Sequence, residues 1–420
     1  MEKIRFAIAI PTYNRIDQLK KTINSILSQK IEKNVELSVV ISNSASDDGT
    51  YEFLNRLKKK NFYIHNKKKK FNNNENFQYF NFENLASTIP ENTDWVWWVG
   101  DDDFFNSSNS VNYVAQKIIK YKSENISLIH ACQTRRATGK SIDIKDTLFN
   151  LCNKFGYHEL LGWISSLVLT KDIMKRTLQE CSKNKFLPRT LANKEGFKKK
   201  IPSAFTHSME IFKQCSNKNA LILDHPNLID PQDFVQTKET KKQWTNDSVG
   251  YRYSLIIDDF LELQKMGLIN KCSSNFFRYL SYKYWDHLAF FYISELLTIG
   301  NQKEIKITQF FIDKVEQQWI KLSQFNQFLE SSYDLKQLSH VFQAGLNYSM
   351  LYINSGFKTE IGELLLDKFK TLINIPTHSF KLTISDTVSL VPNYNEGKRS
   401  IKIQKKLTSK NNTTYQNNYL

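Results

Sequence analysis

The first hundred residues alternate between short apolar runs and longer stretches with helical spacing, and this pattern limits the folds that the chain can adopt. Residues 4–10, 36–41 and 95–99 are strand-like, whereas residues 17–29 and a stretch that reaches residue 60 are helix-like. Such alternation predicts an α/β fold with a mostly parallel central sheet and right-handed crossovers. The polar residues 11–15 are expected to end the first strand. Loops that follow the parallel strands meet at one edge of the sheet, where ligands of open α/β sheets bind.

Three consecutive aspartates, Asp101, Asp102 and Asp103, follow the apolar run that ends at Gly100. Three carboxylates at one strand end repel one another unless a cation or hydrogen-bond donors lie beside them. Mg²⁺ and Mn²⁺ prefer carboxylate and phosphate oxygens, so the triplet predicts a divalent-cation site. The alternative is an acidic turn that caps a helix beginning near Ser107 or Ser108.

Three motifs in this order resemble those of a known family. They are Ala-Ile-Pro-Thr-Tyr-Asn-Arg at residues 9–15, Val-Val-Ile-Ser-Asn-Ser-Ala-Ser-Asp-Asp-Gly-Thr at residues 39–50, and Trp-Trp-Val-Gly-Asp-Asp-Asp at residues 97–103. Together they resemble family 2 glycosyltransferases of the GT-A fold, of the bacterial surface-polysaccharide type. The resemblance covers roughly the first half of the chain. It implies a GT-A catalytic domain, with a Rossmann-like sheet, that binds a nucleoside-diphosphate sugar as donor.

The resemblance also implies roles for individual residues. The nucleotide pocket would be lined by Pro11, Thr12, Asn14 and Arg15, with Asp101 and Asp102 beside the donor. Asp101 and Asp103 would be the outer members of the family's acidic "DXD" motif and would hold Mn²⁺ or Mg²⁺ against the diphosphate.

An Asn-rich segment at residues 71–86 is similar to the stretch that precedes this motif in many relatives. Through that resemblance Asn76, or Asn73, is a candidate nucleotide contact. The alternative is an Asn-rich loop without a ligand.

One position departs from the family pattern. Asn43 stands where the family usually has an aspartate that contacts the base or ribose. An amide donates as well as accepts and carries no charge, so Asn43 is a candidate for reading a different base. Asp47 and Asp48 could replace the missing carboxylate, although Asp48-Gly49-Thr50 is typical of a turn that caps the next helix.

The reaction that the resemblance implies is displacement at the anomeric carbon, with inversion. The acceptor hydroxyl then needs a general base, and Glu210 is the candidate, with His207 as a metal or diphosphate contact or as the base itself. These two residues are three apart at a predicted helix start, so they share a face. Glu210 could instead form a capping box. The acidic residues at 224, 230 and 233 are a second choice.

Length and periodicity predict three regions. We expect a catalytic domain at residues 1–240, a helical region at 245–376 and a basic, Asn-rich, partly disordered tail at 377–420. The helical region includes a helix that ends at Gly267. No run reaches the ~18 apolar residues of a membrane span, and no signal peptide is visible. Five scattered cysteines suit a reducing compartment, so a cytoplasmic location is expected.

The formal net charge of +16 is the second global feature. Lysine clusters at residues 67–70, 194–200 and 398–410 could bind anionic headgroups on the inner face of the plasma membrane, as a peripheral protein would. A solvated basic face is the alternative. The charge and the aromatic content also suggest the hypothesis of a nucleic-acid-binding protein. No recognised motif supports this hypothesis, and no nucleic acid is expected.

The leading hypothesis is therefore a metal-dependent, inverting glycosyltransferase. It would move a sugar, from a UDP-sugar as first choice, to a hydroxyl of a glycan or lipid-linked glycan acceptor in surface-polysaccharide synthesis. An inactive binding or scaffold protein with the same fold is the main alternative. A nucleotidyltransferase fits less well, because the Gly-rich phosphate loop usual after its first strand is missing here.

Overall fold

A computed structural model describes most of the first 232 residues and short parts of the rest. The described residues are 3–57, 59–67, 76–132, 142–185, 205–226, 228–232, 259–269, 272–279, 282–283, 388–392 and 401–405. The chain divides into two units, Met1–Ser281 and Tyr282–Leu420. The helical region predicted at residues 245–376 is described only at 259–269, 272–279 and 282–283, and its other residues lie outside the described residues, as do Asn73 and Asp233. The predicted domain bounds stay predictions.

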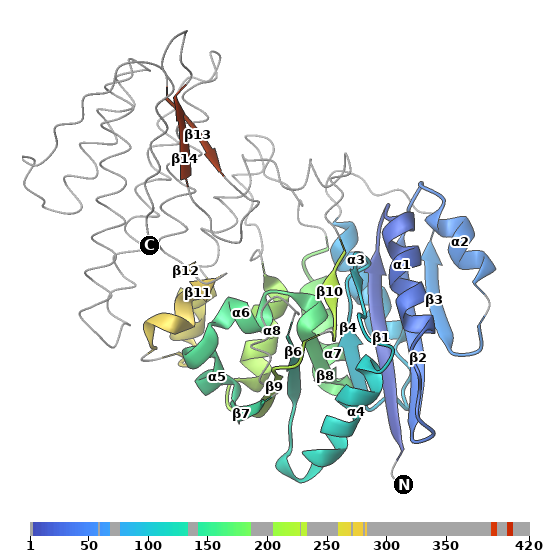
Figure 1. Cartoon of the computed structure of the whole chain (residues 1–420), viewed down its shortest axis with the longest axis horizontal. Coiled ribbons are helices and arrows are strands. Elements are labelled where there is room, and N and C mark those ends of the chain that lie inside the picture. Colours follow the sequence, from blue (N-terminus) through green and yellow to red (C-terminus); the bar gives the residue numbers. More distant parts are fainter. Residues whose placement is uncertain are drawn as a thin grey trace, which may run out of the picture. The chain divides into compact units, whose positions relative to one another are not determined.

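The first unit is built on an eight-stranded sheet with the order β3-β2-β1-β4-β8-β6-β9-β7 (Figure 1). Strands β1, β2, β3 and β4 are mutually parallel, and β6 is parallel to β9. Strands β8 and β7 run antiparallel to their neighbours. The sheet strands are β1 Ile4–Thr12, β2 Val35–Ser44, β3 Phe62–Lys67, β4 Trp95–Trp98, β6 Leu128–Ala131, β7 Asp143–Thr147, β8 Leu167–Thr170 and β9 Asn219–Leu223. The predicted α/β fold with a mostly parallel sheet is thus confirmed.

Helices connect these strands and cover the sheet. The α-helices are α1 Ile16–Leu27, α2 Thr50–Arg56, α3 Phe77–Thr88, α4 Ser110–Lys120, α5 Leu148–Phe155, α6 Tyr157–Leu161, α7 Lys171–Ser182 and α8 Thr206–Cys215. Short 3₁₀ turns are η1 Lys122–Glu124, η3 Ile164–Ser166 and η5 Ser274–Phe277, and a two-stranded ribbon joins β5 Asp103–Phe104 to β10 Asp230–Pro231. The remaining short strands are β11 Arg278–Tyr279 in the first unit and, in the second, β12 Tyr282–Lys283 with the antiparallel pair β13 Val388–Pro392 and β14 Ile401–Lys405.

Strand β4 lies in the interior of the sheet and is covered on both faces. Trp97 packs edge-on against Phe6 and Phe105, in the core cluster that includes the apolar residues of α1 and α4. Trp98 points to the other face and packs against Phe82 of α3, with ring centroids 4.9 Å apart. Because alternate residues of a strand face opposite sides, each tryptophan fills one of the two layers. This double burial explains the unbroken apolar run that precedes the acidic triplet, by which we mean Asp101, Asp102 and Asp103.

The expectation that residues 11–15 end the first strand was wrong by two residues. Strand β1 continues through Pro11 and Thr12, which pair with Ser42 and Asn43 of β2. Proline is tolerated here because β4 pairs only with residues 6–9 of β1. The side of the strand where Pro11 lacks an N–H therefore has no ladder partner to lose.

The reading of residues 71–86 as a loop was wrong from residue 77 onward. Helix α3 begins there, and Asn76 is its N-cap, accepting a hydrogen bond of 3.1 Å from the backbone of Gln78. Polar and apolar residues of α3 are buried alike, so the segment lacks the one-sided apolar stripe that marks an amphipathic helix. Strand β3 was also not predicted.

Asn81 of α3 joins this helix to the ends of β1 and β2. Its amide nitrogen donates to the carbonyl of Thr12 at 2.9 Å, and its oxygen accepts from the hydroxyls of Ser42 and Ser44, each at 2.7 Å. The side chain is buried, so these polar groups have little access to water. One asparagine thus satisfies three buried polar groups at the edge where the site lies.

Replacing Asn81 with alanine is expected to lower the free energy of unfolding by about 3 kcal/mol, because it leaves buried partners unsatisfied. Urea unfolding of the full chain, followed by tryptophan fluorescence, measures this change. Asn84→Ala is the matched control: Asn84 is buried on the same helix, but its side chain makes none of the hydrogen bonds described for this part of the chain. Equal losses in the two variants would contradict the role given to Asn81.

Two further expectations concern helices. The helical segment at residues 259–265 ends as predicted at Gly267, which has φ of +69°, and the amide of Leu268 reaches back to the carbonyl of Leu263 at 2.9 Å. Among the described helices, none is both long enough and apolar enough to span a bilayer.

Candidate active site

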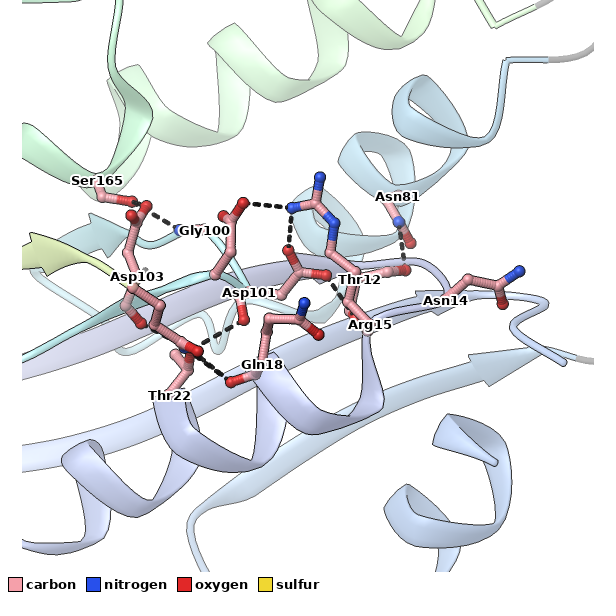
Figure 2. A network of polar contacts seen from close by, with 12 residues as sticks. Thr12, Asn14, Arg15, Gln18, Thr22, Asn81, Gly100, Asp101, Asp103 and Ser165 are labelled. Atoms are coloured by element: carbon pink, nitrogen blue, oxygen red, sulfur yellow. Dashed lines mark hydrogen bonds and ion pairs between the residues drawn. The ribbon is translucent and has the colours of Figure 1, made fainter. Parts of the chain in front are cut away.

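The acidic triplet follows β4 directly, and the loop after β1 lies beside it. This first loop comprises residues 13–15, and Figure 2 shows its Arg15 reaching toward the triplet. The Nη1 atom of Arg15 donates to Asp101 Oδ1 at 3.0 Å and to Asp102 Oδ2 at 2.6 Å. The hydroxyl of Thr12 donates to the second oxygen of Asp101 at 2.8 Å. Both carboxylate oxygens of Asp101 therefore have a donor.

Asp103 points in a different direction from Asp101 (Figure 2). The hydroxyl of Ser165, in η3, donates to Asp103 Oδ2, and the same hydroxyl accepts the backbone N–H of Gly100 at 2.7 Å. The side chain of Trp163 also lowers the pKa of Asp103. Strand β4 and the segment that leads into β8 thus meet at this carboxylate.

The backbone of the triplet is fixed separately from its side chains. The hydroxyl of Thr22, in α1, lies 3.0 Å from the carbonyl of Asp101 and 2.7 Å from that of Asp103. The backbone N–H of Gln232 donates to the carbonyl of Asp102 at 2.8 Å, next to the β5–β10 ribbon. These contacts span most of the first unit, so the position of the triplet depends on the whole fold.

The three carboxylates differ in exposure. The side chain of Asp102 is 44% exposed, whereas that of Asp101 is 7% exposed. Asp103 is buried. Asp102 is consequently the member of the triplet that faces solvent and is open to a ligand.

Burial raises the pKa of the two outer aspartates, Asp101 and Asp103. It raises the pKa of Asp101 to about 6, although the charge of Arg15 opposes the rise. Burial and the charge of Asp102 raise the pKa of Asp103 well above its usual value, while the hydrogen bond from Ser165 lowers it. The pKa of Arg15 is raised, mainly by Asp101, so its guanidinium stays charged.

The raised pKa of Asp101 predicts a pH-dependent stability. A folded-state pKa above the unfolded value gives stability that is fully present below about pH 4 and is lost as the pH rises through 6. Compared with Asp101→Asn, the wild-type protein should lose roughly 2 kcal/mol of unfolding free energy between pH 4 and pH 7.5. Urea titrations of both proteins at several pH values measure the difference. A gap between the two proteins that does not change with pH would contradict this assignment.

The first loop is hydrogen-bonded to the loop after β2, residues 45–49. Asn14, which has φ of +52°, donates to Asp47 Oδ1 at 2.8 Å and accepts the backbone N–H of Asp47 at 2.9 Å. Asp48 accepts the backbone N–H of Ile16 at 2.8 Å and that of Thr50 at 3.1 Å, at the starts of α1 and α2. Asp48 thus takes part in the turn before α2, as predicted, but the N-cap of this helix is Gly49 and no side chain caps it.

The side chain of Asn43 forms hydrogen bonds within the protein. Its oxygen accepts from the hydroxyl of Ser46 at 2.6 Å and from that residue's backbone N–H at 3.3 Å, and its nitrogen donates to Asn66 of β3 at 2.7 Å. Asn43 is fully buried at the end of β2. In this structure it holds the loop after β2, residues 45–49, and its contact with a base stays a prediction.

The two candidate bases lie in α8, as predicted, but the described contacts connect neither of them to the acidic triplet. Glu210 pairs with Lys213 at 2.9 Å. His207 is buried against Trp98, with ring centroids 5.6 Å apart, and burial lowers its pKa to about 4. Its Nε2 atom has no hydrogen-bond partner in the structure described here. The catalytic roles of both residues stay predictions.

The donor set of the triplet suits a hard divalent cation. A Cβ atom on Gly100 would lie 2.6 Å from Asp103 Oδ2 and 3.0 Å from Asp102 Oδ1, so these two oxygens converge beside one glycine. Mg²⁺ and Mn²⁺ sites at diphosphates usually need only one or two carboxylates. Among the described residues, no three His, Cys, Asp or Glu side chains form a cluster that could hold a metal without other ligands. Substrate oxygens would have to complete the coordination.

Comparison with known proteins finds a family match in the first part of the chain. Residues 7–127 match the family model described as "Glycosyl transferase family 2". This match includes both loops and the acidic triplet and confirms the resemblance inferred from the three motifs. A curated protein, abequosyltransferase RfbV of Salmonella typhimurium, is 34% identical over 98 residues, which are 23% of this chain and 28% of that protein. The match therefore spans about a quarter of the length of the curated relative.

The solved structures that this chain matches share little sequence with it. TarS 1-349 of S. aureus in complex with UDP-GlcNAc has a TM-score of 0.44 at 13% identity, covering 96% of this chain and 97% of that one. The mannosyltransferase PcManGT from Pyrobaculum calidifontis, in complex with GDP-Man and Mn²⁺, has a TM-score of 0.40 at 11% identity, covering 89% of this chain and 88% of that one.

Proposed function

We propose that this chain, whose residues 7–127 match glycosyl transferase family 2, is a metal-dependent, inverting glycosyltransferase. The observation that carries the proposal is the acidic triplet at the carboxyl end of β4, bound to Arg15 and Thr12 from the end of β1. Ligands of open α/β sheets bind at this edge. The 34% identity to an enzyme named as an abequosyltransferase supports a sugar as the transferred group.

The proposed transfer reaction requires that the negative charge of the departing diphosphate be neutralised. A nucleoside diphosphate leaves the anomeric carbon readily only when its developing negative charge is balanced. Mg²⁺ or Mn²⁺ held by the triplet would supply a Lewis acid for this purpose. Asp101 and Asp103, the outer members of the acidic motif, are the proposed ligands, and Asp102, the most exposed carboxylate, converges with Asp103 beside Gly100 and is a further proposed ligand. A cation that used Asp101 would share it with Arg15.

The surrounding residues would bind and orient the donor. Arg15 carries a permanent positive charge at the site, which favours an anionic diphosphate. Pro11, Thr12, Asn14, Asn43 and Asn76 are the other proposed pocket residues. Asn14 and Asn43 already fix the two loops that would enclose the nucleotide. Held loops limit the entropy lost when a ligand binds.

The acceptor is proposed to be a hydroxyl of a glycan or lipid-linked glycan in surface-polysaccharide synthesis. Its proton would pass to Glu210, with His207 as the second candidate base. Burial holds His207 neutral at pH 7, and a neutral imidazole can accept a proton. The basic excess of the chain agrees with a cytoplasmic protein that binds an anionic membrane surface peripherally.

Turnover tests this proposal. The full chain is incubated with a panel of UDP-, GDP-, CDP- and dTDP-sugars, with Mn²⁺ or with chelator, and with a glycolipid extract as acceptor. Release of one nucleoside diphosphate, dependent on the cation, is the expected result. Nucleotide binding without any release from the whole panel would favour the inactive scaffold instead.

A further inference from the structure

Ser165 lies far from the acidic triplet in the sequence but contacts it directly. Its hydroxyl donates to Asp103 Oδ2 and accepts the N–H of Gly100 at 2.7 Å. Ser165 is fully buried, so water does not compete for these bonds. A hydroxyl has one hydrogen to donate, and here it goes to Asp103. The orientation of the O–H bond is thus fixed by its two partners.

Ser165 is itself held in place from the opposite side. The indole N–H of Trp97 donates to the backbone carbonyl of Ser165 at 2.8 Å, and Trp97 is fully buried in the core. Strand β8, which begins two residues later, pairs antiparallel with β4. The hydroxyl therefore stands on the turn η3, which leads directly into a central strand of the sheet.

The contact governs the side chain of Asp103 and not its backbone. The carbonyl of Asp103 is bound by Thr22 at 2.7 Å, and its N–H reaches the carbonyl of Gly100 at 3.2 Å. Phe104 and Asp103 also pair with Asp230 and Pro231. Loss of the Ser165 hydroxyl would leave these bonds intact. Asp103 would then keep its position but lose a donor that sets the direction of its carboxylate.

We propose that Ser165 is a positioning residue that aims the Asp103 carboxylate at the divalent cation of the donor complex. The proposal rests on the proposed function, because it takes the acidic triplet as the cation site. Hydrogen-bond partners of metal ligands typically change metal affinity by about 10–100-fold when they are removed. Ser165 acts through Asp103 and touches no reacting atom.

The neighbouring serine provides a matched control. Ser166 is also fully buried in η3, but its hydroxyl donates to the backbone carbonyl of Trp163 at 2.7 Å. Ser165→Ala and Ser166→Ala each delete one buried hydroxyl from the same turn. A purely structural role would make the two variants alike in both stability and cation affinity.

The experiment measures Mn²⁺ affinity from the free-Mn²⁺ electron paramagnetic resonance signal, with each of UDP, GDP, CDP and dTDP present. Ser165→Ala should weaken Mn²⁺ binding by about 10-fold or more, and Ser166→Ala by less than about 2-fold, at similar losses of Tm. In the Asp103→Asn background, Ser165→Ala should have no further effect, because the two residues act as a unit.

Three outcomes would overturn the proposal. Equal Mn²⁺ affinities for the two serine variants would overturn the role of Ser165 alone, as would an undiminished effect of Ser165→Ala in the Asp103→Asn background. A wild-type protein that binds no Mn²⁺ with any nucleotide would overturn both this role and the metal-dependent function.

Discussion

Asp103→Asn is expected to lower kcat/KM for sugar transfer by at least about a hundredfold, because it removes one of the charges that would hold the cation at the leaving group. The substitution keeps the size of the side chain, so it removes the charge with little change in packing. Steady-state release of the nucleoside diphosphate at saturating Mn²⁺ measures the loss.

The control for this variant is Asp172→Asn. Asp172 stands in the first turn of α7, with a side chain that is 92% exposed and an ion pair of 3.9 Å to Lys171. The same chemical change there should leave kcat/KM within about a factor of two, because exposed ion pairs contribute little. Full, metal-stimulated transfer by Asp103→Asn would show that the triplet is not the cation site.

Gly100→Ala is expected to weaken Mn²⁺ and donor binding by about tenfold or more, with little loss of folding. An alanine Cβ would lie 2.6 Å from Asp103 Oδ2 and 3.0 Å from Asp102 Oδ1, which is too close for both carboxylates to stay where they are. Asp103 would have to rotate away from Ser165, and a misaligned ligand loses much of its affinity. Calorimetric titration of the donor nucleotide with Mn²⁺ measures the effect.

Gly267→Ala separates a local clash from a general effect of adding a methyl group. Among the described residues, no atom lies within 4 Å of a Cβ at Gly267, but φ of +69° strains any other residue. This variant should lose about 1 kcal/mol of stability and keep its donor affinity. Donor affinity in Gly100→Ala equal to that of wild type would mean that the carboxylates need not converge beside this glycine.

The sequence was sufficient to predict three strands of the sheet, β1, β2 and β4, and the edge where the candidate site lies. The run at residues 95–99 is apolar on both faces because Trp97 and Trp98 fill opposite layers, and the triplet follows it directly. Local signals also located the turn at Asp48 and the helix end at Gly267. These features depend on neighbouring residues, which a pattern can reveal.

Contacts between distant segments could not be predicted. Ser165 hydrogen-bonds Asp103, which is 62 residues away in the sequence, and Thr22 hydrogen-bonds the same residue from 81 residues away. A serine in an apolar run gives no sign of which buried carboxylate it will bind, because tertiary packing decides that. Helix α3 was missed for a related reason: Asn81 and Asn84 are polar but buried, so its pattern does not alternate between faces.

The measurement that tests the central claim most directly is thermal stabilisation of the full chain by UDP, GDP, CDP and dTDP, each with Mn²⁺ and with chelator. A ligand that binds the native state alone raises its stability, by about 2.7 kcal/mol at a hundredfold excess over Kd. We expect a rise in Tm with one nucleotide, UDP as first choice, that disappears with chelator and in Asp103→Asn. No rise with any nucleotide, or the same rise with chelator, would contradict a metal-dependent nucleotide-sugar site at the acidic triplet.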